Sequence, residues 1–569
     1  MNAILSLNHH KDPQVFRVNE LEDHAYFIPF ATKEQTSLPR EKSPFFHSLN
    51  GVWRFLWRPS IYEFEDFFAP DYDLSSFEEI TLPECWQTHG KDYAQYQASA
   101  YPFLADPPHI PEKNPVASYV KDFDIVPVAG KRYELHFEGK DSCVYVWLNG
   151  HFVGYGEVPH NDSAFDVTPY LQSGANRLCV AVLKWCTGTY FDDQDKLRLS
   201  GIFRDVYLLE RAEQGVRDLA LTADQTGRLD LTVTSGAPVR ASVFEGERLL
   251  GSAEINGNWQ WQCEAPRLWS AEAPHLYDLV LECAGEVIRR RFGFRTVAIQ
   301  NGVFTVNGKP VKFNGVNRHD TAPDVGYAVD ETFVRAELVQ MKQHNVNAIR
   351  TAHYPNAPYF YDLCDELGFY VMCEADQECH GMTYLQNWGG LVNDPLWAPC
   401  IHDRMVRMYE AFKNSPAIVI WSLGNEAGWG QNLNNEAIWF HQIDPTRPVH
   451  YEGAFNAYTK LEEDELIRRT ENIDLLSAMY PPLSDNGGSR AYVQASLEHP
   501  AFAKMPYVMC EYSHAMGNSC GDLTDYWEMI YAYDSFFGGC IWEFTDHAVQ
   551  LDREDANGRP KFVYVGDFG

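Results

Sequence analysis

The sequence predicts a multidomain β plus α/β protein: a jelly-roll sandwich, an immunoglobulin-like sandwich, and a (β/α)8 TIM barrel that lacks its last helix. At 569 residues the chain is too long for one hydrophobic core. Apolar residues alternate with a period of two up to about residue 296, as in half-buried strands. From Val311 onward, short apolar runs alternate with helical stretches, which is typical of βα units around a parallel sheet.

Residues 1–210 are expected to form the jelly-roll domain, a β domain of sugar-binding type. Two of its strands each have one apolar face, formed by Tyr133, Leu135 and Phe137 and by Leu178, Val180 and Val182. Between two further apolar runs lies Asn149-Gly150, a dipeptide preferred in two-residue hairpin turns because both positions need a positive φ. Residues 211–296 continue as short strands, such as 229–233 and 279–281, and their number suits an immunoglobulin-like sandwich.

Residues 297–569 are expected to form the barrel, with strands near 311–316, 346–350, 369–374, 417–423, 448–452, 474–479, 507–510 and 539–544. The helix after the second strand has an apolar face formed by Phe360, Leu363, Cys364 and Leu367. Pro358 stands at its start and Gly368 just past its end. The chain ends about 25 residues after the eighth strand with no helical pattern, so we expect an incomplete barrel.

Charge and composition argue against several classes of partner. The chain has 79 acidic and 46 basic residues, a net charge of -33, which repels nucleic acid and anionic membranes. The N-terminus does not resemble a secretory signal, and no apolar stretch approaches the roughly 20 residues of a membrane helix. The 13 cysteines show no paired spacing, so we expect a protein of the reducing cytoplasm.

Two segments place a glutamate directly after an apolar run. Residues 418–426 end in Asn425-Glu426, and residues 507–511 end in Glu511. Both are expected to deliver a carboxylate at the C-terminal end of a barrel strand, where the functional groups of such barrels lie. A retaining glycosidase needs one carboxylate as nucleophile and one carboxylic acid as proton donor, so this pair suits that chemistry.

Further polar and aromatic residues follow the other strands. They are Asn317, Arg318, His319, His353, Tyr354, Glu378, His380, Tyr480, His514 and Trp542. Each alone has a plainer explanation: a hydrogen-bonded structural histidine, a solvated glutamate or a core tryptophan. Their convergence on one rim favours a binding site instead.

Glu378 and His380, with Glu426 as a third ligand, are a candidate site for a divalent ion. Two ligands two residues apart are a weak motif in isolation, so the residues alone leave this open. Trp542, with Phe544 and Trp429 as aromatic neighbours, offers a flat surface for a sugar. Core packing is an equally good explanation for Phe544.

Several long motifs together resemble the β-galactosidases of glycoside hydrolase family 2, of the long, metal-dependent bacterial kind. These motifs are 193–195 (DQD), 200–206 (SGIFRDV), 315–319 (GVNRH), 353–356 (HYPN), 421–426 (WSLGNE) and 510–518 (CEYSHAMGN). The resemblance runs from about Val15 to the last residue.

The resemblance implies a role for each matching residue. Glu511 matches the nucleophile, Glu426 the acid/base, and Asn425 its substrate-binding neighbour. Glu378, His380 and Glu426 match the ligands of an active-site Mg²⁺. The residues that match galactose contacts are His319, His353, Tyr480, His514 and Trp542. Asp193 matches a sandwich residue that binds both the sugar and Na⁺.

Three positions depart from the family pattern. Ala98 stands where an asparagine near the sugar is usual, and Phe544 replaces a tryptophan. Family members also continue past the final Gly-Asp-Phe-Gly, so the Na⁺ site is expected to be incomplete in this chain.

These observations favour a retaining β-galactosidase that acts on small, lactose-like β-galactosides. Two alternatives remain open. One is another family 2 specificity, such as β-glucuronidase. The other is a fragment that binds sugar weakly, or folds only when a partner chain completes the barrel; assembly as a homo-oligomer is also open.

Overall fold

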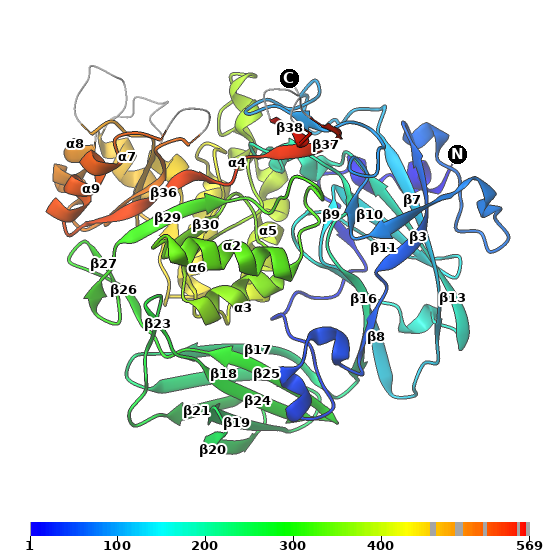
Figure 1. Cartoon of the computed structure of the whole chain (residues 1–569), viewed down its shortest axis with the longest axis horizontal. Helices are drawn as coiled ribbons and strands as arrows, with labels where there is room; N and C mark the ends of the chain where they lie inside the picture. Colours follow the sequence, from blue (N-terminus) through cyan, green and yellow to red (C-terminus); the bar gives the residue numbers. More distant parts are fainter. Residues whose placement is uncertain (1, 456–462, 484–492, 516–519, 555–557, 565–569) are drawn as a thin grey trace.

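The computed structural model describes residues 2–455, 463–483, 493–515, 520–554 and 558–564. Three bodies of structure are visible in Figure 1: a β-sandwich at the right, a second sandwich at the bottom, and an α/β barrel at the upper left. This is the predicted architecture. The described residues include no helix that is both long enough and apolar enough to cross a membrane.

The first sandwich packs a seven-stranded sheet on a four-stranded one. The first sheet has the order β1 (Arg17–Val18), β11 (His151–Gly156), β10 (Cys143–Leu148), β13 (Gly174–Leu183), β7 (Val116–Ile125), β3 (Gly51–Arg58) and β4 (Glu78–Leu82). The second has the order β12 (Ser163–Asp166), β8 (Lys131–Phe137), β16 (Val206–Ala212) and β2 (Phe46–Ser48). The apolar faces predicted on β8 and β13 meet in one core between the sheets.

The predicted hairpin turn joins β10 to β11. Asn149 has a φ of 52° and Gly150 a φ of 81°, so both occupy the left-handed region that a tight primed turn requires.

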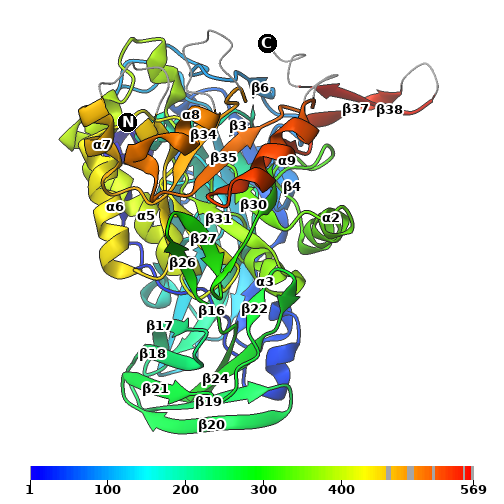
Figure 2. The same ribbon diagram turned by 90° about the vertical axis from the view of Figure 1, so that its left-hand side faces the viewer.

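The second sandwich also follows the expected pattern. One sheet contains β17 (Val216–Ala223), β18 (Arg228–Ser235) and β21 (Asn258–Gln262); the other contains β20 (Arg248–Ile255), β19 (Val239–Glu245), β24 (Tyr277–Cys283) and β25 (Glu286–Phe292). The alternate apolar residues of β18 and β24 pack between the two sheets. Figure 2 shows this sandwich below the barrel.

Eight parallel strands build the barrel. Their order is β33 (Val449–His450), β32 (Ile418–Ser422), β31 (Tyr370–Glu374), β30 (Ala348–Thr351), β29 (Phe313–Arg318), β36 (Phe536–Phe544), β35 (Tyr507–Tyr512) and β34 (Leu476–Met479). Among the described residues no strand ladder joins β33 to β34. They approach through a bond from the Asp474 N–H to the Val449 carbonyl, 3.0 Å.

Helices follow seven of the eight strands. They are α2 (Glu331–Gln343), α3 (Pro358–Leu367), α5 (Ala398–Phe412), α6 (Gln431–Ile443), α7 (Glu463–Thr470), α8 (Val493–Glu498) and α9 (Leu523–Ala532), with the short α4 (Gly390–Asn393) before α5. α3 has the predicted boundaries, and Gly368 ends it with a φ of 81°. In the described residues after β36, a hairpin of β37 (Ala548–Glu554) and β38 (Pro560–Tyr564) takes the place of an eighth helix.

Candidate active site

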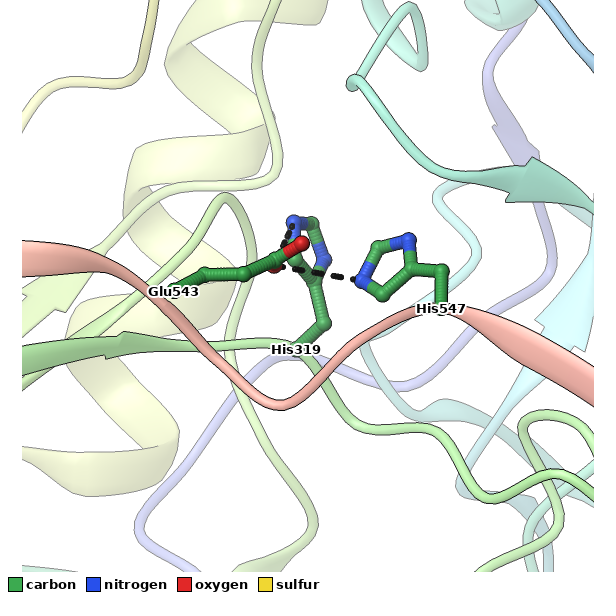
Figure 3. Close-up of side chains that lie close together, drawn as sticks. All are labelled: His319, Glu543 and His547. Atoms are coloured by element: carbon green, nitrogen blue, oxygen red, sulfur yellow. Dashed lines mark ion pairs between the residues drawn. The ribbon is translucent and has the colours of Figure 1, made fainter. Parts of the chain in front are cut away.

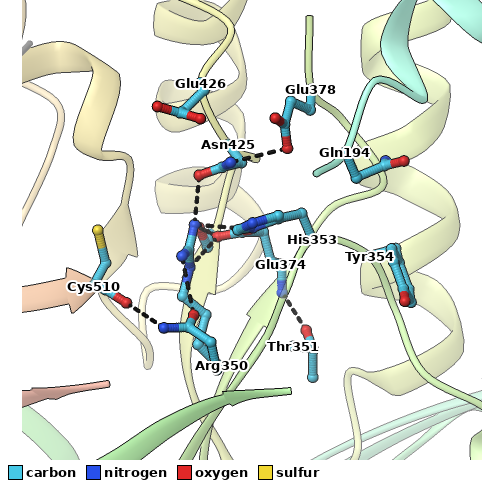
Figure 4. A network of polar contacts seen from close by, with 12 residues as sticks. Gln194, Arg350, Thr351, His353, Tyr354, Glu374, Glu378, Asn425, Glu426 and Cys510 are labelled. Atoms are coloured by element: carbon cyan, nitrogen blue, oxygen red, sulfur yellow. Dashed lines mark hydrogen bonds and ion pairs between the residues drawn. The ribbon is translucent and has the colours of Figure 1, made fainter. Parts of the chain in front are cut away.

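Arg350, at the C-terminal end of β30, lies at the centre of the barrel rim and is fully buried. Its Nε and Nη2 donate to the two oxygens of Glu374 on β31, at 2.7 and 2.9 Å. Its Nη1 donates to Glu511 Oε1 at 2.8 Å and to Asn317 Oδ1 at 3.1 Å. Its Nη2 also donates to Asn425 Oδ1 at 2.9 Å. One guanidinium therefore connects the ends of five strands (Figure 4).

Glu511, at the end of β35, is 5% exposed and is held at both carboxylate oxygens. Arg350 donates to Oε1, and the Tyr480 hydroxyl donates to Oε2 at 2.7 Å. The Tyr480 backbone N–H also donates to the Glu511 carbonyl at 2.9 Å. Two donors and a neighbouring positive charge stabilise the ionised form of a carboxylate. Glu511 is thus held in one position by a donor at each oxygen.

Glu374, beside Glu511, is fully buried and shares Arg350 with it. Burial raises the pKa of this carboxyl, but the Arg350 guanidinium and the hydrogen bond with His353 outweigh burial and hold the pKa at about 2. His353 Nδ1 lies 2.6 Å from Glu374, and its Nε2 lies 3.8 Å from Glu511 Oε1. His353 therefore bridges the two carboxylates on this side of the rim.

Glu426 follows β32 on the opposite side of Asn425 from Arg350 (Figure 4). Its φ of 29° is in the left-handed region, a conformation that costs an ordinary residue on the order of 1–3 kcal/mol and is common at functional sites. Its Oε2 lies 2.7 Å from His380 Nδ1, and the two side chains are 18% and 17% exposed. Glu426 is therefore held in place and also reaches solvent.

Glu378 and Glu452 crowd the neighbourhood of Glu426. Burial and the charge of Glu426 raise the pKa of Glu378 well above its usual value, and the same two causes raise that of Glu452 to about 8. Glu378 Oε2 accepts from Asn425 Nδ2 at 2.9 Å. Its Oε1 is buried and has no hydrogen-bond partner among the described residues. Among the described residues, no guanidinium donates a hydrogen bond to these carboxylates on this side of the rim, which is rich in acidic groups.

The predicted metal ligands Glu378, His380 and Glu426 come together, with one ligand atom from each inside a span of 4.8 Å. Glu378 Oε1 is buried without a hydrogen-bond partner among the described residues, and a bound cation would satisfy it. Two carboxylates and an imidazole are a donor set for a hard divalent ion such as Mg²⁺ or Mn²⁺. The residues present therefore fit the implied metal.

Asp193 reaches the barrel from the first sandwich, as expected. Its Oδ2 accepts from the Gly381 N–H at 2.7 Å, and its Oδ1 accepts from Arg198 at 2.8 Å. Burial raises its pKa to about 6, against the opposing charge of Arg198. The Glu378 N–H donates to the Phe191 carbonyl at 2.8 Å, so the sandwich supports the very segment that carries Glu378 and His380.

The aromatic residues divide into two groups. Trp542 on β36 stacks on His353, with ring centroids 5.1 Å apart and an angle of 11° between the ring planes. The ring centroids of His514 and Tyr480 are 5.8 Å apart. Trp429 instead stacks on Tyr451, and Phe544 packs against the barrel core. Of the predicted aromatic surface, the site therefore contains Trp542.

Two other predicted residues have further partners, and a third position, Ala98, is one of the departures from the family pattern. His319 lies edge-on to Trp542, with ring centroids 5.5 Å apart, but its Nε2 faces Glu543 at 3.7 Å. Arg318 pairs with Glu337 of α2, which is a structural contact within the barrel wall. Ala98 is exposed.

Sequence reasoning missed Arg350, Glu374 and Glu452. The first two end apolar strands, Ala348-Ile349-Arg350 and Val371-Met372-Cys373-Glu374, and both are fully buried. A charged residue that closes an apolar run was the available signal, because a buried charge needs a partner. Glu452 follows β33 in the same way.

Three family models match the chain. Residues 46–212 match the sugar binding domain of glycosyl hydrolases family 2, residues 216–295 match a domain described by that family name, and residues 297–569 match its TIM barrel domain. Among curated proteins, the chain is 40% identical over 99% of its length to a β-galactosidase of Actinobacillus pleuropneumoniae. It is 37% identical over 100% of its length to one of Staphylococcus xylosus. The chain spans 57% of the length of each.

Solved structures show the same fold. A β-glucuronidase of Faecalibacterium prausnitzii superposes with a TM-score of 0.70 at 22% identity, covering 91% of this chain and 95% of that one. A β-glucuronidase of Bifidobacterium dentium gives a TM-score of 0.68 at 20% identity, covering 91% and 95%.

Proposed function

Because the chain belongs to family 2 of the glycosyl hydrolases, we propose that it carries the active site of a retaining β-galactosidase. The substrates of this proposal are small β-galactosides such as lactose. The curated relatives named above, which share 40% and 37% identity with the chain, support this specificity. The observation that carries the mechanism is the Arg350 guanidinium, which donates to Glu511 and to Asn425, the residue just before Glu426.

The first step forms a glycosyl-enzyme ester. A Glu511 carboxylate oxygen attacks the anomeric carbon, the bond from that carbon to the leaving oxygen breaks, and the carboxylic acid of Glu426 gives its proton to the leaving oxygen. The Tyr480 hydroxyl and Arg350, which donate to Glu511, hold the attacking oxygens in place. Asn425, fixed between Arg350 and Glu378, is placed to contact a sugar hydroxyl beside the cleaved bond.

The second step releases the sugar. Glu426, now a carboxylate, takes a proton from water, and the hydroxide oxygen attacks the anomeric carbon. The ester bond to Glu511 breaks, so that galactose leaves with the β configuration retained and both glutamates return to their starting state. Two displacements at opposite faces produce this retention.

The proposed Mg²⁺ would be held by Glu378, His380 and Glu426 and would supply positive charge beside the acid/base. The Na⁺ implied at Asp193 fits less well, because Arg198 already neutralises that carboxylate at 2.8 Å, and we assign it no step.

His353 and Trp542 form a stacked pair beside Glu511 that suits the apolar face of a sugar. Tyr480, His514 and Asp193 complete the proposed sugar contacts.

The thirteen free thiols support a reducing compartment, and we place the protein in the cytoplasm.

A glucuronide is the discriminating substrate. Its carboxylate would enter a rim that already holds Glu426, Glu378 and Glu452, and the guanidinium of Arg350 is occupied by four acceptor groups. Burying one more carboxylate beside these acids, while the Arg350 guanidinium is already occupied, costs more than burying a neutral sugar hydroxyl, so the neutral galactoside is favoured.

The test compares hydrolysis of nitrophenyl β-galactoside and nitrophenyl β-glucuronide by the 569-residue chain, with and without Mg²⁺. We expect galactoside hydrolysis that Mg²⁺ increases. Hydrolysis of the glucuronide alone would contradict the specificity. If activity appears only after a second chain is added, made from the part of a relative that this chain does not span, this chain needs a partner to complete it. Gel filtration of the active species would show whether it is a homo-oligomer.

A further inference from the structure

A second group of ligating side chains lies at the end of β36, apart from Glu378, His380 and Glu426. It consists of His319, which follows β29, Glu543 on β36, and His547, which precedes β37 (Figure 3). Glu543 Oε2 lies 3.7 Å from His319 Nε2 and 3.3 Å from His547 Nε2. One ligand atom from each residue falls within a span of 4.8 Å.

The polar atoms of this group are buried and unsatisfied. The side chains of His319, Glu543 and His547 are 1%, 2% and 3% exposed. Neither Nε2 atom and neither oxygen of Glu543 has a hydrogen-bond partner among the described residues. Buried polar groups in folded proteins are nearly always satisfied, and leaving one unpaired costs about 1–3 kcal/mol, more for a charged group. Unsatisfied ligand atoms from three residues, all within 4.8 Å of one another, indicate that a cation can bind between them.

We propose that His319, Glu543 and His547 form a binding site for a divalent transition-metal ion, with Zn²⁺ as the preferred ion. Two imidazoles and one carboxylate are a common Zn²⁺ ligand set, which leaves a fourth position open. At Zn–N and Zn–O distances of about 2.0–2.2 Å, tetrahedral geometry separates ligand atoms by about 3.3–3.6 Å. The separations of 3.3 and 3.7 Å from Glu543 Oε2 need only small adjustments to meet this geometry.

The surroundings orient His319 for this role. Its Nδ1 lies 3.0 Å from the Tyr354 hydroxyl, which also accepts the Asp320 N–H at 3.1 Å. When Nδ1–H donates to that hydroxyl, Nε2 presents its lone pair to Glu543 and His547. A hydrogen bond at the distal nitrogen is the usual support of a metal-bound histidine. Tyr354 is thus a positioning residue for the proposed ion.

An ion pair between His547 and Glu543 is the simpler alternative. It would satisfy one oxygen of Glu543 but leave His319 Nε2 and the second oxygen unpaired in a buried place. The donor set also separates this site from the first one, because two imidazoles favour Zn²⁺ whereas two carboxylates favour Mg²⁺. The proposal does not depend on the activity proposed above.

The direct experiment is a Co²⁺ titration of the whole metal-free chain in the presence of excess Mg²⁺, which occupies the first site. We expect visible d–d bands of a low-coordinate Co²⁺ ion, which one equivalent of Zn²⁺ abolishes. No variant is needed for this readout, so it does not depend on the folding of a mutant. Absence of the bands would overturn the proposal.

Variants then assign the ligands by Zn²⁺ affinity, measured in competition with a chromophoric chelator. E543Q and H547Q are each expected to bind Zn²⁺ at least about 100-fold more weakly, since loss of even a supporting residue costs 10–100-fold. Y354F is expected to lose about 10-fold.

H402Q is the matched control. His402 Nδ1 lies 2.9 Å from Glu436 Oε2, a histidine–glutamate pair that belongs to neither group of three ligands found among the described residues. Its Zn²⁺ affinity should be unchanged. Equal affinities in H547Q and H402Q, with both variants folded, would show that the ion pair explains the arrangement and would overturn the metal site.

Discussion

The two sides of the barrel rim differ in how their carboxylates are balanced. On one side, Glu511 and Glu374 share the Arg350 guanidinium, and the pKa of Glu374 is held at about 2. On the other side, Glu378 and Glu452 lie near Glu426, no guanidinium of the described residues donates a hydrogen bond to them, and the pKa of Glu452 is raised to about 8. Asn425 separates the two environments. Two glutamates of one rim, Glu374 and Glu452, therefore have pKa values that their neighbours shift in opposite directions.

This contrast is what a double displacement needs. A nucleophile must be an anion at the moment of attack, whereas a proton donor must keep its proton until the leaving oxygen departs. We therefore call the Glu511 side the compensated side and the Glu426 side the acid-rich side. Each variant below removes one part of the contrast.

Removal of the nucleophile on the compensated side should have the largest effect. E511Q is expected to lower kcat on a nitrophenyl β-galactoside by roughly 10⁴-fold or more, because the amide cannot form the ester. Steady-state kinetics would measure the loss. Glu79, 63% exposed on β4, supplies the control E79Q, which should keep full activity. Near-normal turnover by E511Q would exclude Glu511 as the nucleophile.

Loss of the proton donor on the acid-rich side should have the next largest effect. E426Q is expected to lower kcat by roughly 10²–10⁴-fold on a substrate with a poor leaving group, because the aglycone oxygen then leaves without a proton. Azide, which needs no general base, should restore turnover of an activated substrate and yield a β-galactosyl azide. A β-galactosyl azide from E511Q, with an α-galactosyl azide from E426Q, would exchange the two roles.

Weakening the shared guanidinium tests the cause of the contrast. R350K keeps the charge but loses the planar fork, so we expect kcat to fall by about 10²-fold. R318K is the matched control, because Arg318 is equally buried and binds Glu337 and Asp320 away from the rim. Both variants should lose stability in urea, but only R350K should lose kcat. Equal losses of kcat would mean that Arg350 acts only on the fold.

Metal removal tests the acid-rich side. E378Q is expected to lower activity at fixed Mg²⁺ by about 10–100-fold, because the carboxylate that completes the ligand set is lost. Removal of Mg²⁺ with a chelator is expected to lower the activity of the unmodified chain by a similar factor. Calorimetric Mg²⁺ titration should show the weaker binding directly. E366Q, whose parent residue pairs with Arg291 and Arg335, should bind Mg²⁺ normally. An unchanged Mg²⁺ affinity in E378Q would remove Glu378 from the proposed ligands.

The pH dependence of stability should have opposite signs on the two sides. The pKa of Glu452 rises on folding from 4.5 to about 8, so the folded chain binds the extra proton and this residue lowers stability as pH rises from 4.5 to 8. The pKa of Glu374 falls from 4.5 to about 2, so its contribution is present above pH 4.5 and is lost as pH falls toward 2.

E452Q should therefore flatten the loss of stability between pH 5 and 8, by an amount on the order of a few kcal/mol at pH 8. Thermal unfolding of the metal-free chain and of E452Q across this range would measure it. Parallel stability curves for the two proteins would contradict the raised pKa.

Much of this arrangement was predictable, because a polar residue after an apolar run marks the C-terminal end of a buried strand in the sequence. Glu426 and Glu511 directly follow apolar runs, and the barrel topology sends both to one rim. The helix boundaries at Pro358 and Gly368 were equally readable, since one residue fixes φ and the other permits the left-handed region.

The rest depended on contacts that no local pattern encodes. Arg350 resembles the polar end of a strand in the sequence, and its role appears only once Glu374, Glu511 and Asn425 surround it. The side chain of His319, predicted as a sugar contact, lies edge-on to Trp542, and its Nε2 also faces Glu543. Such orientations follow from the packing of distant strands.

The most direct test of the account is the identity of the residue that becomes esterified. A 2-deoxy-2-fluoro galactoside with an activated leaving group should trap the intermediate, and peptide mass spectrometry would locate it. We predict one galactosyl adduct per chain, on Glu511. An adduct on Glu426, or turnover of this substrate with no adduct at all, would contradict the assignment of the anion to the compensated side.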